Sequence, residues 1–238
     1  MINEVYNIDC MEYMKTVPDN FFDLAIVDPP YGISVDRQSL CNGLGLAKEK
    51  NTMRRIKKSR MHGSGKLKDR AINKFNTSWD SEPPKQEYFD ELFRVSKNQI
   101  IWGGNYFNLP PTRGIVCWDK DQSFLNFSQW EMAWTSFDTP AKIFRFSNRG
   151  FACPEKGEKI HPTQKPVALY KWLLATFGSG GGGLVLDTHV GSGSIRIACD
   201  EMGYDFVGCE IDKDYWEAQE KRYAEWKKGA GSQLQFGF

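Results

Sequence analysis

Short apolar runs that end at polar residues alternate along the chain with segments of helical periodicity. The apolar runs predict strands at residues 4–9, 22–27, 98–104, 114–118, 130–137, 142–146, 184–187 and 206–211. Apolar residues spaced three or four apart predict helices at 11–16, 86–95, 167–177, 194–202 and 215–226. Alternating strands and helices favour a parallel sheet, and the strands at 114–118 and 130–137 add an antiparallel pair. The predicted fold class is therefore α/β: a Rossmann-like, doubly wound, mostly parallel sheet with an antiparallel hairpin at one edge.

The strand predicted at 22–27 ends abruptly at Asp28, which is followed by Pro29, Pro30 and Tyr31. Neither proline has a backbone N–H and each fixes its own φ, so this segment forms a rigid loop. In open α/β sheets, ligands bind at the carboxyl ends of the strands, where this loop would lie. A carboxylate, two prolyl carbonyl groups and an aromatic ring suit a planar base that carries an exocyclic amino group. A solvent-exposed Pro-Pro turn is the alternative.

A second candidate site follows the strand predicted at 184–187. Its residues are Asp187, Gly191, Ser192, Gly193, Ser194 and Glu210. Glycines at a strand-to-helix turn let the backbone approach a ligand, and an acid nineteen residues beyond Gly191 is placed to accept both hydroxyl groups of a ribose. Arg196 replaces the third glycine of a dinucleotide fingerprint, so a nucleoside with a charged amino-acid tail fits better than NAD. A tight turn with a surface glutamate is the alternative.

Charge is distributed unevenly along the chain. The net charge is +1, but residues 36–74 hold twelve Lys or Arg against three acids, a local surplus of nine. The rest of the chain is therefore net negative by eight. A basic segment within an acidic chain is typical of an element that binds phosphate groups. A solvated, disordered loop is the alternative interpretation of the same residues.

Composition limits where the protein works and what it binds. The 238 residues suffice for one sizeable core, and no apolar run approaches the roughly 20 residues of a membrane span. The N-terminus lacks the basic and apolar regions of an export signal. Six cysteines occur without a CxxC pair, and the three histidines lie far apart. We therefore expect reduced thiols, a cytoplasmic location, and neither a disulfide framework nor a metal site.

Seven short motifs follow one another in a specific order. They are IDC at 8–10, DPPYG at 28–32, WGGNYF at 102–107, WDK at 118–120, HPTQKP at 161–166, DTHVGSGS at 187–194 and GCEID at 208–212. In this order they resemble the motifs of amino-group DNA methyltransferases of the N6-adenine/N4-cytosine type. The arrangement is similar to that of the β-class, in which the catalytic half precedes the cofactor half. The resemblance implies a single methyltransferase domain over residues 1–238 with a circularly permuted Rossmann-like sheet.

The resemblance further implies S-adenosylmethionine as the cofactor. The matching positions are Asp9 and Cys10 for the adenine, Glu210 for the ribose, His161, Thr163 and Lys165 for the methionine end, and Asp187, Gly191, Ser192, Gly193 and Ser194 for the first glycine motif. A lysine beside a carboxylate is electrostatically favourable at the methionine end. Thr188 and His189 depart from the family, which usually has Pro-Phe at these positions.

For the reaction, the resemblance places the catalytic residues in Asp28, Pro29, Pro30 and Tyr31, called the acidic prolyl loop below. An aromatic amine delocalises its lone pair into the ring, so hydrogen bonds to the Asp28 carboxylate and the Pro29 carbonyl would free that pair for attack. The target base has to be flipped out of double-stranded DNA and would stack on Tyr31. Asp at the first motif position favours adenine N6. Methylation of cytosine N4, of RNA or of a protein amide stays open, as does a catalytically inactive binding module.

Two inserted regions are expected to contact DNA. Residues 33–76 form the predicted basic loop that contacts the DNA backbone, and the family places a short target-recognition region at about 119–160. Within it, Trp130 and Trp134 are expected to pack in the core rather than to contact bases. A second subunit and a partner restriction endonuclease stay open as further partners.

Overall fold

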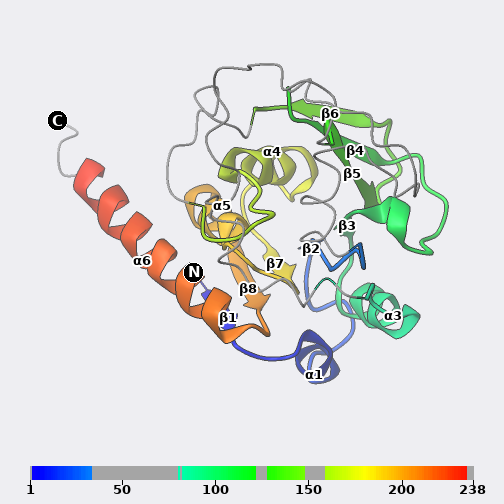
Figure 1. Cartoon of the computed structure of the whole chain (residues 1–238), viewed down its shortest axis with the longest axis horizontal. Coiled ribbons are helices and arrows are strands. Elements are labelled where there is room, and N and C mark those ends of the chain that lie inside the picture. Colours follow the sequence, from blue (N-terminus) through cyan, green and yellow to red (C-terminus); the bar gives the residue numbers. More distant parts are fainter. Residues whose placement is uncertain (1, 34–79, 81, 122–127, 148–158, 235–238) are drawn as a thin grey trace, which may run out of the picture.

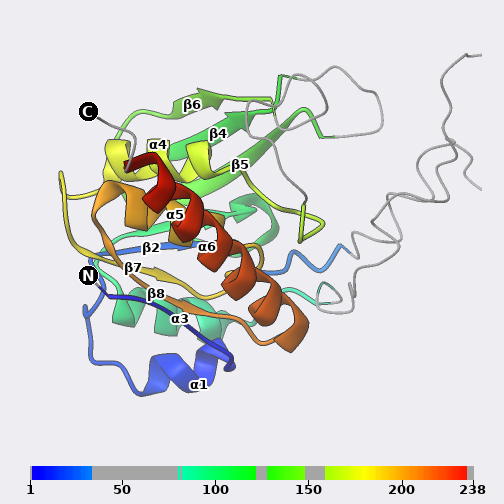
Figure 2. The same cartoon turned by 90° about the vertical axis from the view of Figure 1, so that its left-hand side faces the viewer.

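The computed structural model describes residues 2–33, 80, 82–121, 128–147 and 159–234, and these form a central sheet with helices on both faces (Figure 1, Figure 2). The strands are β1 (Asn3–Tyr6), β2 (Leu24–Val27), β3 (Gln99–Trp102), β4 (Ile115–Asp119), β5 (Trp130–Thr135), β6 (Lys142–Arg145), β7 (Leu184–Asp187) and β8 (Asp205–Cys209). The helices are α1 (Cys10–Lys15), α3 (Gln86–Val95), α4 (Val167–Phe177), α5 (Ser194–Met202) and α6 (Lys213–Leu234), with a 3-10 turn η4 (Gly104–Tyr106) after β3.

The strand order across the sheet is β1-β8-β7-β2-β3-β5-β4-β6. Among the described strands, only β5 runs antiparallel to its neighbours, β3 and β4, and β6 pairs parallel with β4 at the outer edge. This arrangement confirms the predicted Rossmann-like, mostly parallel α/β sheet with its antiparallel hairpin close to one edge. The hairpin forms because β4 and β5 are joined directly, whereas the parallel strands need crossover connections.

Alternating side chains along the strands build two separate cores. Leu24 and Ile26 of β2 face a cluster that contains residues of α4 and α5, whereas Ala25 and Val27 face a cluster with residues of α1 and α3. Figure 2 shows α1 and α3 on one side of the sheet and α4, α5 and α6 on the other. Both faces of the central strands are therefore covered, as an apolar run such as LAIV predicts for a parallel sheet.

The sheet order brings the two candidate sites together. Strands β2 and β7 are neighbours, and Ala25 pairs with Leu186 in parallel register. Their carboxyl ends therefore lie at the same edge of the sheet. The acidic prolyl loop after β2 and the glycine turn after β7 leave the sheet side by side, although more than 150 residues separate them along the chain.

Three sequence-based expectations differ from the structure. The strand predicted at 4–9 ends at Tyr6, because the Asp9 carboxylate instead accepts the Met11 N–H at 2.7 Å and caps α1. Trp134 is buried as expected, whereas the side chain of Trp130, the first residue of β5, is exposed. The last helix is longer than predicted and continues to residue 234.

The two predicted DNA-contacting regions are only partly described. Of residues 33–76, all but residue 33 lie outside the described residues. Much of the range 119–160 belongs to the sheet, as strands β5 and β6. The remaining parts of that range include 122–127 and 148–158, which also lie outside the described residues.

Candidate functional site

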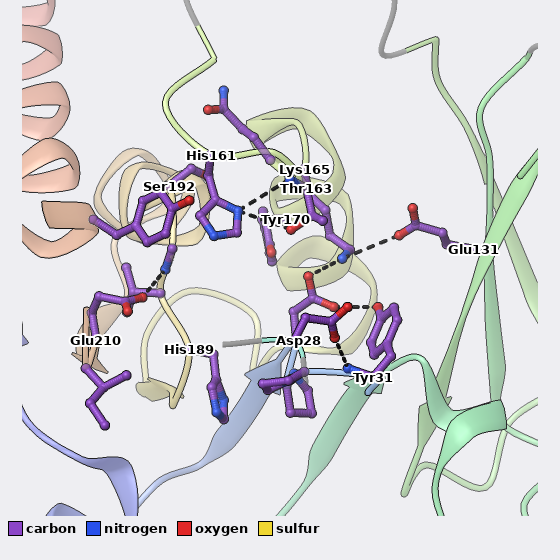
Figure 3. A pocket seen from close by; sticks show the side chains of 18 residues that line it. Asp28, Tyr31, Glu131, His161, Thr163, Lys165, Tyr170, His189, Ser192 and Glu210 are labelled. Carbon is purple, nitrogen blue, oxygen red and sulfur yellow. Dashed lines mark hydrogen bonds and ion pairs between the residues drawn. The ribbon is translucent and has the colours of Figure 1, made fainter. Parts of the chain in front are cut away.

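The acidic prolyl loop is held by hydrogen bonds from several elements. The Tyr31 hydroxyl donates to Asp28 Oδ1 at 2.6 Å, and the Lys165 ammonium forms an ion pair with Asp28 Oδ2 (Figure 3). Asp80, almost fully buried, accepts the backbone N–H groups of Tyr31 and Gly32 at 2.9 and 3.0 Å. The loop is therefore preorganised, with the Asp28 carboxylate at the carboxyl end of β2.

The Tyr31 ring packs within a group of aromatic side chains. It stacks on Tyr106 with ring centroids 4.9 Å apart and meets the edge of Phe107 at 6.1 Å. Burial, and then the nearby Asp28 carboxylate, raise the pKa of Tyr31 well above its ordinary value. The hydroxyl group therefore stays protonated and can keep donating to Asp28.

Lys165 lies beside Asp28, two residues before α4, and is buried, with 3% of its side chain exposed. Burial alone would lower the pKa of Lys165, but the carboxylates of Asp28 and Glu131 outweigh it and raise the pKa above its ordinary value. The lysine is therefore a charged partner of the acidic prolyl loop. Glu131, from β5, lies 3.4 Å from the Lys165 ammonium.

The glycine turn after β7 is tied to Glu210 at the end of β8. Glu210 accepts the backbone N–H of Gly191 at 2.8 Å through Oε2 and that of Asp212 at 2.9 Å through Oε1. Burial raises the pKa of Glu210 above its ordinary value, although these two hydrogen bonds favour the ionised form. Each carboxylate oxygen can accept a further hydrogen bond, so the side chain can still bind hydroxyl groups.

Two histidines lie between Asp28 and Glu210 in the same close view (Figure 3). His161 Nδ1 lies 3.1 Å from the Thr163 hydroxyl, and its ring meets the edge of Tyr215 at 4.5 Å. His189 Nδ1 lies 2.9 Å from the Thr188 hydroxyl. Burial lowers the pKa of both histidines to about 4, so both are neutral at pH 7. Thr188 and His189 thus replace the apolar Pro-Phe pair of the family with a polar pair.

A cavity of about 330 Å³ joins the two candidate sites. Its lining residues are Asp28, Pro29, Pro30, Tyr31, Asp80, Glu131, His161, Thr163, Gln164, Lys165, Tyr170, His189, Val190, Gly191, Ser192, Glu210, Ile211 and Tyr215. Figure 3 shows Asp28 and Glu210 on opposite sides of this space. The volume falls in the range of about 300–1,000 Å³ that is usual for small-molecule sites. Residues from both halves of the chain can therefore contact one ligand.

Five predicted site residues lie in the described part of the chain but outside this lining: Asp9, Cys10, Asp187, Gly193 and Ser194. Asp9 caps α1, and Asp187 accepts the His189 N–H at 3.0 Å while almost fully buried. Ser194 is buried and its hydroxyl accepts from Arg222 at 2.9 Å. In this structure, these five residues therefore do not line the cavity.

Several lining residues were not predicted as site residues, among them Asp80, Glu131, Tyr170, Ile211 and Tyr215. Ile211 directly follows Glu210, and an apolar residue next to the predicted ribose acid was a signal that the sequence offered. Asp80 and Glu131 carry no local signal, because their contacts reach residues 49 and 34 positions away.

Within the residues that the structure describes, no group of three His, Cys, Asp or Glu side chains could hold a metal ion. The four cysteines described there, 10, 117, 199 and 209, are free thiols. Of the helices in the described ranges, none combines the length and the apolar character needed to cross a bilayer.

Comparisons with known proteins find similarity to DNA methyltransferases. A family model described as DNA methylase matches residues 118–221. The type II methyltransferase M.HpaI of Haemophilus parainfluenzae is 36% identical over 83 residues, which is 35% of this chain and 26% of that protein. The type II methyltransferase M2.MboI of Moraxella bovis is 22% identical over 258 aligned residues, covering 93% of this chain and 87% of that protein. The chain thus spans most of M2.MboI but only about a quarter of M.HpaI.

Two solved structures share the fold. The M1.HpyAVI–SAM complex has a TM-score of 0.52 and 18% identity, covering 93% of this chain and all of that one. The cytosine-N4-specific PvuII DNA methyltransferase has a TM-score of 0.56 and 12% identity, covering 94% of this chain and 86% of that one. At such identities the likeness concerns the fold, which agrees with the predicted Rossmann-like class.

The fold and the cavity define a Rossmann-like α/β protein whose acidic prolyl loop and glycine turn meet at one edge of the sheet. Together with the matching family model and the two type II methyltransferases, they identify the chain as a relative of the amino-group DNA methyltransferases of the N6-adenine/N4-cytosine type. The resemblance of the sequence to methyltransferases of this type is confirmed.

Proposed function

We propose that this protein transfers a methyl group from S-adenosylmethionine to the exocyclic amino group of a base in DNA, with adenine N6 as the target. The observation that carries the proposal is the single cavity lined by both Asp28 and Glu210. A nucleoside cofactor held at one side of it would face a base held at the other side. S-adenosylmethionine supplies a methyl group already activated by its sulfonium, so the chain needs to bind, orient and exclude water.

The residues of the glycine side fit such a cofactor. Glu210 has lone pairs for ribose hydroxyl groups, and the exposed side chain of Ile211 offers an apolar surface next to it. Neutral His161 and the Thr163 hydroxyl supply polar contacts elsewhere in the lining. Asp187, Gly193 and Ser194, together with Asp9 and Cys10, stay predicted cofactor residues that lie outside the lining. We assign the predicted cofactor contacts to the residues of the glycine side, and we assign Lys165 to the acidic prolyl loop because it pairs with Asp28.

The residues of the acidic prolyl loop fit an amino group. Asp28 and the Pro29 carbonyl are acceptors, and they would draw both amine hydrogens into hydrogen bonds that favour a pyramidal nitrogen. Because Lys165 and Tyr31 fix the Asp28 carboxylate, these acceptors need little reorganisation when the base arrives. A base inside a duplex cannot reach this cavity, so it enters flipped out of the stack.

For the DNA backbone, we assign the basic residues 33–76, and for target recognition the range 119–160. The local surplus of nine positive charges in residues 36–74 supports the first assignment. The second rests on the position of the range between the hairpin and the HPTQKP motif. Together they describe one catalytic domain over residues 1–238 with two regions that contact DNA.

The test is to incubate the purified protein with S-adenosylmethionine and mixed-sequence double-stranded DNA, then digest the DNA and analyse its nucleosides by mass spectrometry. N6-methyladenine is the expected product. N4-methylcytosine would move the assignment to the other amino group of the family. A methylated RNA substrate with unmodified DNA, or no product from any nucleic acid, would overturn the proposal.

A further inference from the structure

Four charged side chains of alternating sign run from the acidic prolyl loop into the sheet: Asp28, Lys165, Glu131 and Lys120, called the charge ladder below. Lys165 forms an ion pair with Asp28 and lies 3.4 Å from Glu131 Oε2. Glu131 forms a second ion pair, through Oε1, with Lys120. Figure 3 shows Lys165 between Asp28 and Glu131. The four charges sum to zero, so the ladder is neutral as a whole.

The charge ladder is largely withdrawn from solvent. The side chains of Lys165, Lys120 and Glu131 are 3%, 16% and 27% exposed. The ammonium groups of Lys165 and Lys120 lie over the rings of Trp102 and Trp118, at 5.1 and 5.2 Å from the ring centroids. In such a place an unpaired charge is costly, and the strength of each ion pair depends on every other charge nearby.

Glu131 is therefore ionised despite its surroundings. Burial alone would raise the pKa of Glu131, but the ammonium groups of Lys165 and Lys120 outweigh it and lower the pKa below its ordinary value. The Lys165 ammonium thus stands between two carboxylates and is shared by them.

This sharing matters because both oxygens of Asp28 already have a partner. Oδ1 accepts from the Tyr31 hydroxyl and Oδ2 is paired with Lys165. An incoming amino group needs acceptor capacity on the same carboxylate. An ammonium that paired with Asp28 alone would compete with that amino group, whereas a second carboxylate attracts the ammonium from the other side.

We propose that Glu131 is a positioning residue for methyl transfer: it holds Lys165 between two carboxylates so that Asp28 keeps acceptor capacity for the target amino group. The inference rests on the proposed function. It adds a residue that lies outside the acidic prolyl loop and the glycine turn, and that acts through Lys165 without touching the reacting atoms.

The experiment compares the full-length wild type with Glu131→Gln, Glu131→Asp and a matched control, Glu201→Gln. The control removes the same charge from a glutamate that pairs with a lysine, Lys171 of α4, at 2.6 Å, but on the surface. Each protein is assayed for kcat and KM with DNA, for cofactor affinity by calorimetry, and for melting temperature.

Glu131→Gln is expected to lower kcat about tenfold or more, because Lys165 then pairs with Asp28 alone. Cofactor affinity should stay within about twofold of the wild type, since the charge ladder lies on the Asp28 side of the cavity, opposite Glu210. Glu131→Asp restores the charge and should recover part of kcat, and Glu201→Gln should match the wild type. This split and this rescue are not expected of a merely structural ion pair.

Unchanged kcat in Glu131→Gln beside an active wild type would overturn this inference and leave the proposed function standing. A parallel loss of kcat and cofactor affinity in both Glu131 variants would overturn it too, as a general structural defect. A wild type inactive on all nucleic acids overturns both proposals. If Glu131→Gln does not fold, Glu131→Asp decides: a lower kcat at wild-type cofactor affinity supports the role, and a parallel loss of kcat and cofactor affinity overturns it.

Discussion

The backbone of Gly103 lies directly against the ring of Tyr31, so closely that a Cβ at position 103 would overlap with three ring atoms. Gly103 follows β3 and adopts a positive φ of 69°. Gly103, which follows β3, therefore sets the position of the Tyr31 ring, which follows the neighbouring strand β2. The WGGNYF motif thus contributes to the acidic prolyl loop by leaving room for it.

Gly103→Ala should reduce methylation strongly while leaving cofactor affinity near that of the wild type. The added methyl group would push the Tyr31 ring and its hydroxyl away from Asp28. The strain of a positive φ adds about 1–2 kcal/mol of destabilisation. Methylation rates and cofactor affinity, measured on the same preparation, separate the two effects.

Gly203→Ala is the matched control for this substitution. Gly203 ends α5 with a φ of 76°, and no heavy atom lies within 4 Å of its Cβ position. Both variants carry the strain of a positive φ, but only Gly103→Ala should lose activity beyond what its melting temperature explains. Equal activity in the two variants would contradict the proposed role of the Tyr31 position.

Asp28→Ala should abolish turnover and leave cofactor affinity nearly intact. The substitution removes the acceptor that the target amino group requires and leaves the buried Lys165 with Glu131 as its carboxylate partner. Methyl transfer to DNA and calorimetric cofactor binding provide the measurement. Activity like that of the wild type would rule out Asp28 as the acceptor.

Tyr31→Ala should weaken binding of the flipped base by about 1–3 kcal/mol, the usual contribution of base–aromatic stacking. In the structure, Tyr106 stacks on this ring at 4.9 Å. Tyr31→Phe keeps the ring and removes the hydrogen bond to Asp28, so it should affect kcat more than DNA affinity. Fluorescence of a 2-aminopurine at the target position reports base flipping, and indistinguishable signals for wild type and Tyr31→Ala would exclude stacking on Tyr31.

Asp187 should make the free protein less stable as pH rises. Burial raises the pKa of Asp187 from 3.8 to about 8, so the folded state keeps a proton that the unfolded chain releases near pH 4. The stabilising contribution is complete below about pH 4 and is lost as pH rises to about 8. Relative to Asp187→Asn, the unfolding free energy of the wild type should fall across this range by up to about 1.4 kcal/mol per pH unit.

Chemical denaturation at several pH values measures this difference. Asp187→Asn can still accept the His189 N–H, so the comparison isolates the charge. Asp138→Asn, on an exposed aspartate, is the control and should run parallel to the wild type. Parallel curves for wild type and Asp187→Asn would show that Asp187 titrates as an ordinary carboxylate.

Deletion of residues 45–68 should lower DNA affinity more than cofactor affinity. These residues hold nine of the twelve basic side chains between 36 and 74, and phosphate contacts release counterions on binding. The affinity of the full chain should therefore fall steeply with salt, and that of the deletion variant less steeply. Equal DNA affinity and equal salt slopes would contradict the assignment of this segment to the backbone.

The sequence by itself was sufficient for features that depend on neighbours along the chain. The apolar run before Asp28 and the periodicity at 86–95 and 167–177 predicted β2, α3 and α4, because burial of one face or stripe requires those patterns. The motif order also predicted which family the chain is related to. The strand predicted at 4–9 was too long, because a polar residue such as Asp9 suits a strand end as well as the helix cap that it forms.

Only the tertiary structure decided which side chains meet across the sheet. Lys165 pairs with Asp28 across 137 residues, Glu131 reaches the same lysine from β5, and Asp80 binds the backbone of the loop. No periodicity encodes such contacts, because they depend on strand order, on register and on the direction in which each loop leaves the sheet. Those features are set by packing of both faces at once, and the charge ladder beside Asp28 is the consequence.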